Sequence, residues 1–193
     1  MHLLTAFFCF LAAPFWDAKP AGQWTNEEVQ SMFSRSPWVS VAYPIGATGS
    51  RVPIPVYLAS ARPMREADQE VEKRTKRASD PLVEEFRQWE KENGDKYLVL
   101  AILQPRTLVT LDSKERKRME SDCVLRVGRK TYKMVMHFPA SSSDARLRLI
   151  FPRAVQPTDK NFLFELYLPL VSGPYREVEY SVKELYSNAK LEY

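Results

Sequence analysis

The chain of 193 residues carries two cysteines and two histidines, the side chains most often used for nucleophilic and metal-assisted chemistry. One of each lies in the apolar N-terminal stretch, which leaves Cys123 and His137 as the candidate Cys–His pair. Both fall in an expected β-hairpin whose turn, Gly128-Arg129, suits a two-residue type II′ connection. In that register Cys123 lies opposite Met134 and faces inward, whereas His137 faces outward. Because a nucleophile needs its base within ~3 Å, we expect a buried, inert thiol and no catalytic dyad.

Other signatures of catalysis and cofactor binding are missing from the sequence. A Ser-His-Asp triad could use only His137, and there is no G-x-S-x-G turn. The six glycines form no Walker or dinucleotide fingerprint, and His and Cys do not cluster as zinc ligands do. A carboxylate pair for glycoside hydrolysis stays open, because any two of 24 acidic residues could converge. We therefore expect no cofactor and no metal, and a function that does not rest on catalysis.

The N-terminal stretch from Leu3 to Trp16 is apolar and is followed by small residues. It is too short to cross a membrane, which takes ~20 helical residues, and it matches the apolar region of a secretory signal peptide. We predict a signal peptide over residues 1–18, with the mature chain beginning between Pro14 and Gln23 and exported to the periplasm or secreted. The alternative is an uncleaved N-terminal membrane anchor. An exported mature chain keeps one cysteine and forms no internal disulfide.

The net charge of +4 raises the question of a polyanionic partner. The basic clusters lie beside acidic residues, and residues 62–96 hold nine basic and ten acidic side chains. This pattern indicates a solvated, salt-bridged surface, and no nucleic-acid-binding motif accompanies it. We expect no nucleic acid as a partner. Arg65, Arg74 and Arg77 are the candidate surface for a protein partner, or for weak contact with anionic lipid or glycan.

The stretch "QWTNEEVQSMFSRSPW" (23–38) predicts a helix with a structural role. Thr25 and Glu28 have the spacing of a capping box, and Trp24 with Val29 that of a hydrophobic staple. The helix should end before Pro37, because the residue before a proline avoids the α region.

The elements that follow predict an α+β fold in a single domain over residues 23–193. Residues 38–43 and 52–59 read as strands, and the prolines in the second place it at a sheet edge. Two antiparallel helices should form an insertion over 63–93 that covers the sheet, and the apolar run 97–103 a central strand buried on both faces. After a short capped helix from Asp112, five alternating runs without intervening helices predict antiparallel pairing. We expect an antiparallel sheet or sandwich with the N-terminal helix and the insertion on one side, closed by the C-terminal run.

Four segments, "WTNEEVQSMFSRSPW", "VYLASARPMREADQE", "IFPR" and "VKELYSNAKLEY", resemble the spaced motifs of a group of uncharacterised exported bacterial proteins. That pattern is similar to W-T-x-x-E-V, S-P-W-A, R-W-x-S-A-x-P-V-R-x-A, F-P-R and a terminal G-K-L-E-L. This chain departs from it at Val39, at Tyr57-Leu58 and at Asn188-Ala189-Lys190. The resemblance implies export and a bacterial source, and it brings no activity.

We therefore expect a non-enzymatic interaction or structural module of the bacterial envelope with a protein partner. The alternative is an extracellular module that binds glycan or polyanion, or a carboxylate-based hydrolase. Nothing in the sequence indicates an oligomeric state.

Overall fold

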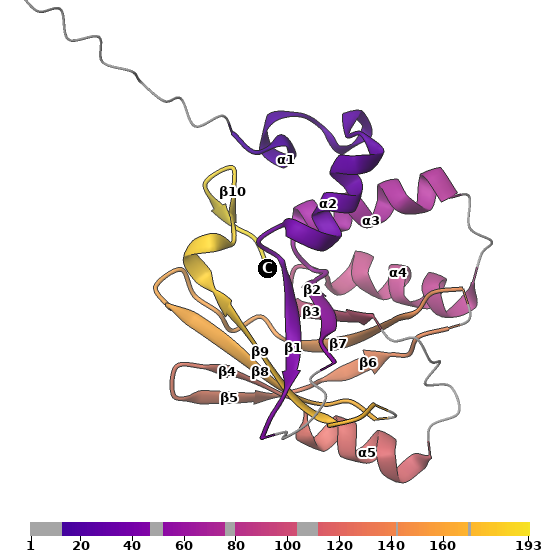
Figure 1. Ribbon diagram of the computed structural model, residues 1–193, viewed down its shortest axis with the longest axis vertical. Coiled ribbons are helices and arrows are strands. Elements are labelled where there is room, and N and C mark those ends of the chain that lie inside the picture. Colours follow the sequence, from indigo (N-terminus) through magenta and orange to yellow (C-terminus); the bar gives the residue numbers. More distant parts are fainter. Residues whose placement is uncertain (1–12, 47–51, 76–79, 104–111, 142, 170) are drawn as a thin grey trace, which may run out of the picture.

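One antiparallel sheet of nine strands organises the chain, and helices cover it (Figure 1). The computed structural model describes residues 13–46, 52–75, 80–103, 112–141, 143–169 and 171–193. The strand order is β5-β4-β8-β9-β1-β2-β3-β7-β6. The strands are β1 (Val39–Pro44), β2 (Ile54–Leu58), β3 (Tyr97–Leu103), β4 (Val124–Val127), β5 (Lys130–Lys133), β6 (Met136–Phe138), β7 (Arg146–Pro152), β8 (Asn161–Tyr167) and β9 (Tyr175–Ser181). The expected α+β class with a large antiparallel sheet is confirmed.

The α-helices lie before and between the strands, and a 3-10 turn follows β9. They are α1 (Phe15–Ala18), α2 (Asn26–Arg35), α3 (Arg62–Thr75), α4 (Pro81–Asn93) and α5 (Ser113–Asp122), with 3-10 turns η1 (Ala21–Gln23) and η3 (Val182–Glu184). A separate two-stranded hairpin, β10 (Tyr186–Ser187) and β11 (Lys190–Leu191), ends the chain.

The sheet curls into a half-barrel so that its two ends meet. Strands β5 and β6 stand at opposite ends of the strand order, yet they follow each other in the chain. The two residues between them change partners: Met134 N donates to Cys123 O beside β4 at 3.2 Å, and Val135 N donates to Ile150 O in β7 at 2.8 Å. The alternating run that the sequence presents as one strand is therefore divided between the two ends of the sheet.

The interior of the curl is filled by aromatic rings from β7, β8 and β9. Phe151 and Phe164 lie with ring centroids 5.1 Å apart, and Phe162 stacks on Tyr180 at 5.5 Å. All four rings are less than 4% exposed. Along β9, successive residues alternate between exposed and buried, so one face of the strand points into the core. Such ring pairs add about 0.5–1.5 kcal/mol each beyond the apolar area that they bury.

Strand β3 is buried on both faces, as its continuous apolar run predicts. Residues 98 to 102 have no exposed surface. One face of β3 looks into the curl, and the other looks toward the layer of α3 and α4 (Figure 1). Full burial on both sides explains why the run does not alternate.

The expected edge position of the second strand is wrong, because β2 lies between β1 and β3. In an antiparallel strand the N–H and C=O of one residue point to the same neighbour, and Leu58 N donates to Trp38 O on the β1 side. Odd-numbered residues of β2 therefore point to β3, as Ala59 N does when it donates to Val99 O. The ladder with β3 begins only at Val56, so the missing N–H of Pro55 falls just beyond it.

The N-terminal helix forms as predicted. Thr25 and Glu28 make both bonds of the capping box: Glu28 N donates to Thr25 Oγ1 at 3.2 Å and Thr25 N to Glu28 Oε2 at 2.7 Å. Trp24 and Val29 are buried. Ahead of this helix, α1 lies inside the expected signal peptide 1–18, yet Trp16 packs edge-on against the buried Trp38 with centroids 5.6 Å apart.

The C-terminal segment docks against the start of α3 and does not extend the sheet. Strand β9 pairs with β8 and β1, whereas β10 and β11 pair only with each other. Trp38 Nε1 donates to Glu192 O at 2.8 Å, and Arg62 Nη2 donates to Ser187 Oγ at 2.5 Å. Glu192 and Tyr193 are buried. The expectation of a docked end is confirmed. The expectation that the run 178–193 closes the sheet holds for its first residues, which lie in β9, and is wrong for the final hairpin, which forms a separate sheet.

The turn of this last hairpin contains a strained residue. Asn188 and Ala189 have φ of 49° and 59°, the left-handed pair of a type I′ turn. Glycine tolerates this region because it has no Cβ, and asparagine because its short polar side chain can hydrogen-bond locally, whereas alanine pays roughly 1–2 kcal/mol there. Ala189 stands just before Lys190, where the exported bacterial motif has glycine.

We predict that Ala189→Gly stabilises the protein by roughly 1 kcal/mol, because glycine removes the steric cost at positive φ. The free energy of unfolding, measured by urea denaturation, should rise. Ala154→Gly is the matched control, since Ala154 lies in a loop without positive φ. There the added chain entropy should lower stability slightly. A loss of stability at position 189 would show that the turn has another geometry.

Candidate functional site

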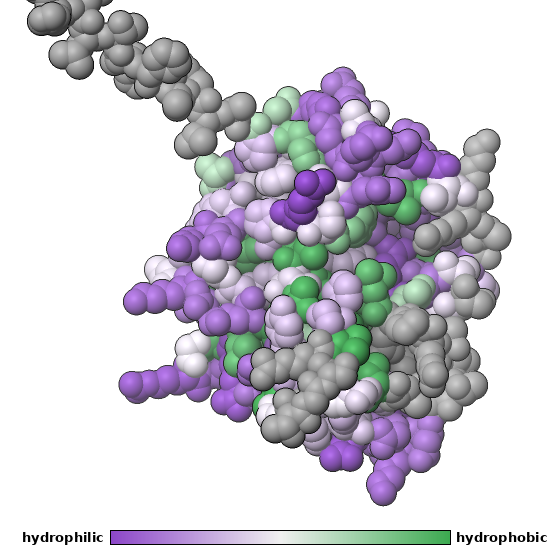
Figure 2. Space-filling view, in the orientation of Figure 1, coloured by the Kyte–Doolittle hydropathy of each residue, from purple (hydrophilic) through white to green (hydrophobic). Residues whose placement is uncertain are grey.

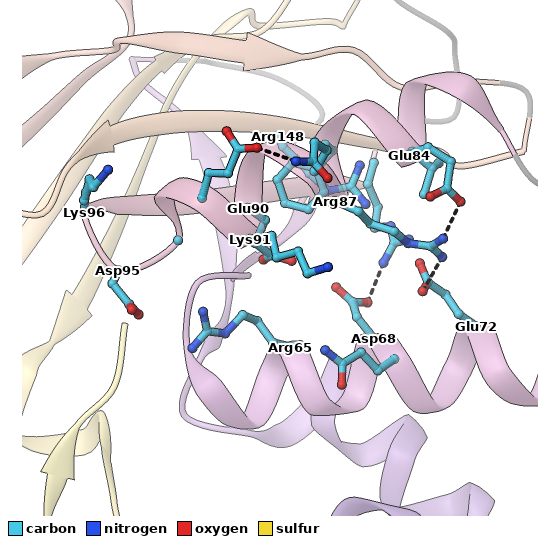
Figure 3. A pocket seen from close by; sticks show the side chains of 17 residues that line it. Arg65, Asp68, Glu72, Glu84, Arg87, Glu90, Lys91, Asp95, Lys96 and Arg148 are labelled. Atoms are coloured by element: carbon cyan, nitrogen blue, oxygen red, sulfur yellow. Dashed lines mark hydrogen bonds and ion pairs between the residues drawn. The ribbon is translucent and has the colours of Figure 1, made fainter.

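A polar cleft of about 650 Å³ lies between α3 and α4, with β7 at its floor (Figure 3). Its volume falls in the range of small-ligand sites. Six basic and six acidic side chains line it, so the lining is neutral overall. The expected pair of helices is thus present, and their inner faces border a charged cleft.

The sheet builds the cleft floor through one row of facing residues. Tyr57 on β2, Ala101 on β3, Arg148 on β7 and Phe138 on β6 are successive cross-strand partners. Residues directly opposite each other point to the same face of a sheet. The small side chain of Ala101 leaves room above β3 for the long side chains on either side.

Asp144, in the loop before β7, fixes the two buried arginines of that strand. Arg146 donates to it through Nε at 2.5 Å and Nη2 at 2.8 Å, and Arg148 through Nη2 at 2.7 Å. Burial would raise the pKa of Asp144, but the bond from Arg146 and the charges of both arginines outweigh burial and lower the pKa to about 2. Asp144 is therefore ionised at neutral pH.

The same loop is bound to the N-terminus of α4. Asp80 caps this helix by accepting from Leu82 N at 2.9 Å, and it accepts the hydroxyl of Ser141 at 2.5 Å. Ser141 Oγ in turn accepts from Asp144 N at 3.1 Å. One hydroxyl thus links the cap of α4 to the carboxylate that orients the arginines.

Asp68 connects α3 to the floor. It is bound by Arg146 Nη1 and by the Tyr57 hydroxyl, which donates to Oδ2 at 3.2 Å. Removal from water raises the pKa of Asp68, and the guanidinium of Arg146 opposes this rise. Burial raises the pKa of Tyr57, and the negative charge of Asp68 raises it further. The phenol therefore stays protonated and donates its hydrogen bond.

Arg148 has donors that the protein itself does not use. The residue is 4% exposed, and its guanidinium carbon lies 4.3 Å from the centroid of the Phe86 ring. Its Nε is buried without a hydrogen-bond partner, and its Nη1 has none within the described residues. A buried guanidinium normally has most of its N–H groups bonded, so this group is incompletely satisfied.

Glu90, on α4, is a half-buried carboxyl group that forms no ion pair within the described part of the cleft. Burial raises its pKa, the charge of Arg65 opposes the rise, and Asp68 adds to it. Glu90 and Asp68 are the two carboxyls whose chemistry could resemble that of a hydrolase pair. Asp68 is already bonded to Arg146 and Tyr57, so it is not free to act as base or nucleophile. The arrangement suits holding a ligand better than cleaving one.

The three arginines of the expected surface have different positions. Arg65 lines the cleft. Arg74 is used within the fold: it donates to Trp24 O at 2.8 Å, to Asn26 Oδ1 at 2.9 Å and to Glu70, and thereby clamps α3 to the start of α2. Arg77 lies outside the described residues.

Cys123 and His137 have separate structural partners. The expected hairpin register is found, with Val127 opposite Lys130 and a positive φ at Gly128. Cys123 is fully buried, its sulfur accepts from Tyr167 N at 3.4 Å, and burial raises the pKa of the thiol to about 12. His137 Nδ1 lies 3.7 Å from Glu120 on the surface of α5, and burial lowers its pKa.

Sequence reasoning missed Arg148, Asp144 and Glu90. A signal was present in β7, where "RLRLIFP" places two arginines at alternate positions of an otherwise apolar strand. Both share one face, and both are buried. Alternating cations in such a strand indicate a buried ion network whose acidic partners come from elsewhere in the chain.

A different face of the molecule is apolar. Figure 2 shows hydrophobic side chains gathered over the middle of this face, with charged ones around its periphery. The exposed apolar residues include Tyr43, Ile45 and Val52, at the facing ends of β1 and β2. Residues 47–51, which connect the two strands, lie outside the described residues.

No family model, no curated protein and no solved structure matches this chain. Within the described residues, no helix has both the length and the apolar character needed to span a membrane.

We predict that Asp144→Asn lowers the free energy of unfolding by about 3–5 kcal/mol, because it leaves two buried arginines without their shared carboxylate. Because the pKa of Asp144 is lower in the folded than in the unfolded chain, its ionisation stabilises the fold at pH values above the pKa in the unfolded chain. That contribution is lost as the pH falls toward about 2. Urea denaturation between pH 7 and pH 2 should show a smaller acid dependence in the variant. Asp95→Asn, at an exposed position, is the control. An equal acid dependence in Asp144→Asn and the wild type would contradict the network.

Proposed function

We propose that this chain is an exported, non-enzymatic interaction module of the bacterial envelope that holds a segment of a partner protein between α3 and α4. The observation that carries the proposal is Arg148, a buried cation at the cleft floor with N–H groups that no described residue accepts. The volume of about 650 Å³ is enough for a few residues of an extended chain. The motif resemblance and the apolar N-terminal stretch support export.

The charge of the cleft favours a protein segment over a polyanion. A polyanion binds through an excess of positive charge, whereas this lining has equal numbers of acidic and basic side chains. The aromatic ring of Phe86, on α4, is also unavailable for stacking on a sugar, because it is 6% exposed and Arg148 covers its face. A peptide that carries both charges and backbone polar groups is the better complement.

We predict that a partner captured from the envelope of the native host stays bound in 1 M salt, where the screening length is ~3 Å and attraction by exposed charge alone fades. Arg65→Glu, which changes the cleft, should abolish capture of that protein. Arg126→Glu is the matched control, since Arg126 lies half-exposed on β4 and pairs with Glu165.

The measurement is quantitative mass spectrometry of proteins retained by each variant at low and high salt. If binding disappears in high salt and both variants lose it equally, association depends on general charge, and the glycan or polyanion alternative replaces the proposal.

We predict that the mature chain in the envelope begins at Pro14 or Phe15, at the early end of the expected range. Phe15 packs edge-on against Trp24 with centroids 5.4 Å apart, and Trp16 packs against Trp38. A later start would uncover these buried indoles, at a cost of about 25 cal/mol per Å² of apolar surface. N-terminal sequencing of the protein from its native host decides the point. A chain that begins after Ala18 and is equally stable would refute this boundary.

A further inference from the structure

Glu90 lines the cleft together with Arg65 and Arg148, and it forms no ion pair with either of them. Arg65 reaches across from α3, and its Nη1 lies 3.2 Å from where a Cβ on Gly94 would stand, at the end of α4. Arg148 comes from the floor. Both guanidinium charges act on the Glu90 carboxyl and oppose the effect of its burial. These three groups come from three different elements, and all three line the same cleft (Figure 3).

We propose that this part of the cleft is a carboxylate-binding site, in which Arg148 and Arg65 hold the ligand's carboxylate and Glu90 is the internal anion that competes with it. The inference deepens the proposed function and rests on it: the partner would present a free carboxylate, such as its chain end. A planar guanidinium with unused N–H groups matches a carboxylate, to which it can donate two parallel bonds.

The local charge selects a singly charged group. Near the floor, three arginines face three carboxyl groups: Arg65, Arg146 and Arg148 against Asp68, Asp144 and Glu90. With Glu90 ionised this set is neutral, and with Glu90 protonated it has one positive charge. One carboxylate restores neutrality. A phosphate or sulfate dianion would leave an excess negative charge beside Asp68 and Asp144, which is unfavourable in a partly desolvated site.

Binding should therefore be coupled to protonation of Glu90. A ligand anion near Glu90 favours its neutral form, so the complex takes up a proton and affinity falls as pH rises through the pKa of this carboxyl. Burial already raises that pKa in the free protein. The charged groups that act on Glu90 from the packed elements are Arg65, Asp68 and Glu72 on α3 and Arg148 on β7.

A purely structural role for Glu90 makes a different prediction. If Glu90 only neutralises the two arginines, Glu90→Gln leaves an uncompensated positive charge, lowers the free energy of unfolding and gives no preference for the free over the amidated peptide. If it competes with a ligand, Glu90→Gln removes the competitor and strengthens binding. A gain of affinity cannot come from misfolding, so the result for Glu90→Gln can be interpreted even if the variant is less stable.

The test uses the full chain and three probes: acetate, N-acetyl-trialanine with a free C-terminus, and the same peptide amidated. Affinities are measured by chemical-shift titration at pH 5.5 and pH 7.5, with sulfate as the tetrahedral anion. We expect the free peptide to bind at least tenfold more tightly than the amidated one, and more tightly at pH 5.5. Glu90→Gln should bind about three- to tenfold more tightly at pH 7.5 and lose most of the pH dependence. Arg65→Gln should bind roughly tenfold more weakly, and Arg126→Gln as the wild type does.

Two results would overturn the proposal. One is equal affinity for the free and amidated peptides, or no binding of either at millimolar concentration. The other is unchanged or weaker binding by Glu90→Gln. Binding of acetate as tight as that of the peptide would identify a small acid as the source of the carboxylate. Capture of a partner that Arg65→Glu abolishes, without any preference for a free carboxylate, would sink this inference and leave the proposed function standing.

Discussion

The bidentate contact between Arg146 and Asp144 is the interaction on which the arrangement of the helical layer depends. Moving a guanidinium from water into a protein interior costs several kcal/mol unless a partner compensates for the lost hydration. Strand β7 carries two such groups on one face, and a single carboxylate serves both. The remaining N–H groups of Arg146 then bond to Asp68 and Tyr57, which brings α3 to the sheet. Without that carboxylate the floor would hold two buried charges of the same sign.

This network also explains why the cleft exists. Helices normally close on a sheet through apolar side chains, and α4 does so at one end, where Phe86 and Trp89 pack on Phe138. Elsewhere the space between α3 and α4 is occupied by charged side chains that need polar neighbours or water. Each helix is also held by contacts outside the cleft. Arg74 clamps α3 to the N-terminal segment, and Asp80 ties α4 to the loop before β7.

Local rules predicted most of the fold. The capping box at Thr25, the buried run of β3 and the turn at Gly128 depend on neighbouring residues, and the structure confirms each. The errors concern long-range partners. Pro55 is compatible with an interior strand because the hydrogen-bonded pairing of β2 with β3 begins one residue later, at Val56. No local sequence pattern shows where that pairing begins.

The candidate site could be predicted less well, for the same reason. Its residues come from 57 to 148 in the chain, and only the fold brings them together. Arg65 was identified as a surface cation, and it lines the cleft. Arg74 looked equally available, but its partners Trp24 and Asn26 are about fifty positions away. The paired arginines of β7 were the one usable signal, and their meaning depends on a carboxylate in a separate loop.

The place of β9 in the sheet has a consequence for the order in which the chain can fold. This strand, near the end of the sequence, lies between β8 and β1 and joins them. The first strand to be synthesised therefore lacks one of its two neighbours until almost the whole chain exists. Pairing of strands so far apart in the sequence is slow, because the entropy of closing the intervening loop is lost before the stabilising contacts form. The sheet is therefore completed only after β9 has been synthesised, so co-translational folding of the first strands is delayed until almost the whole chain is available.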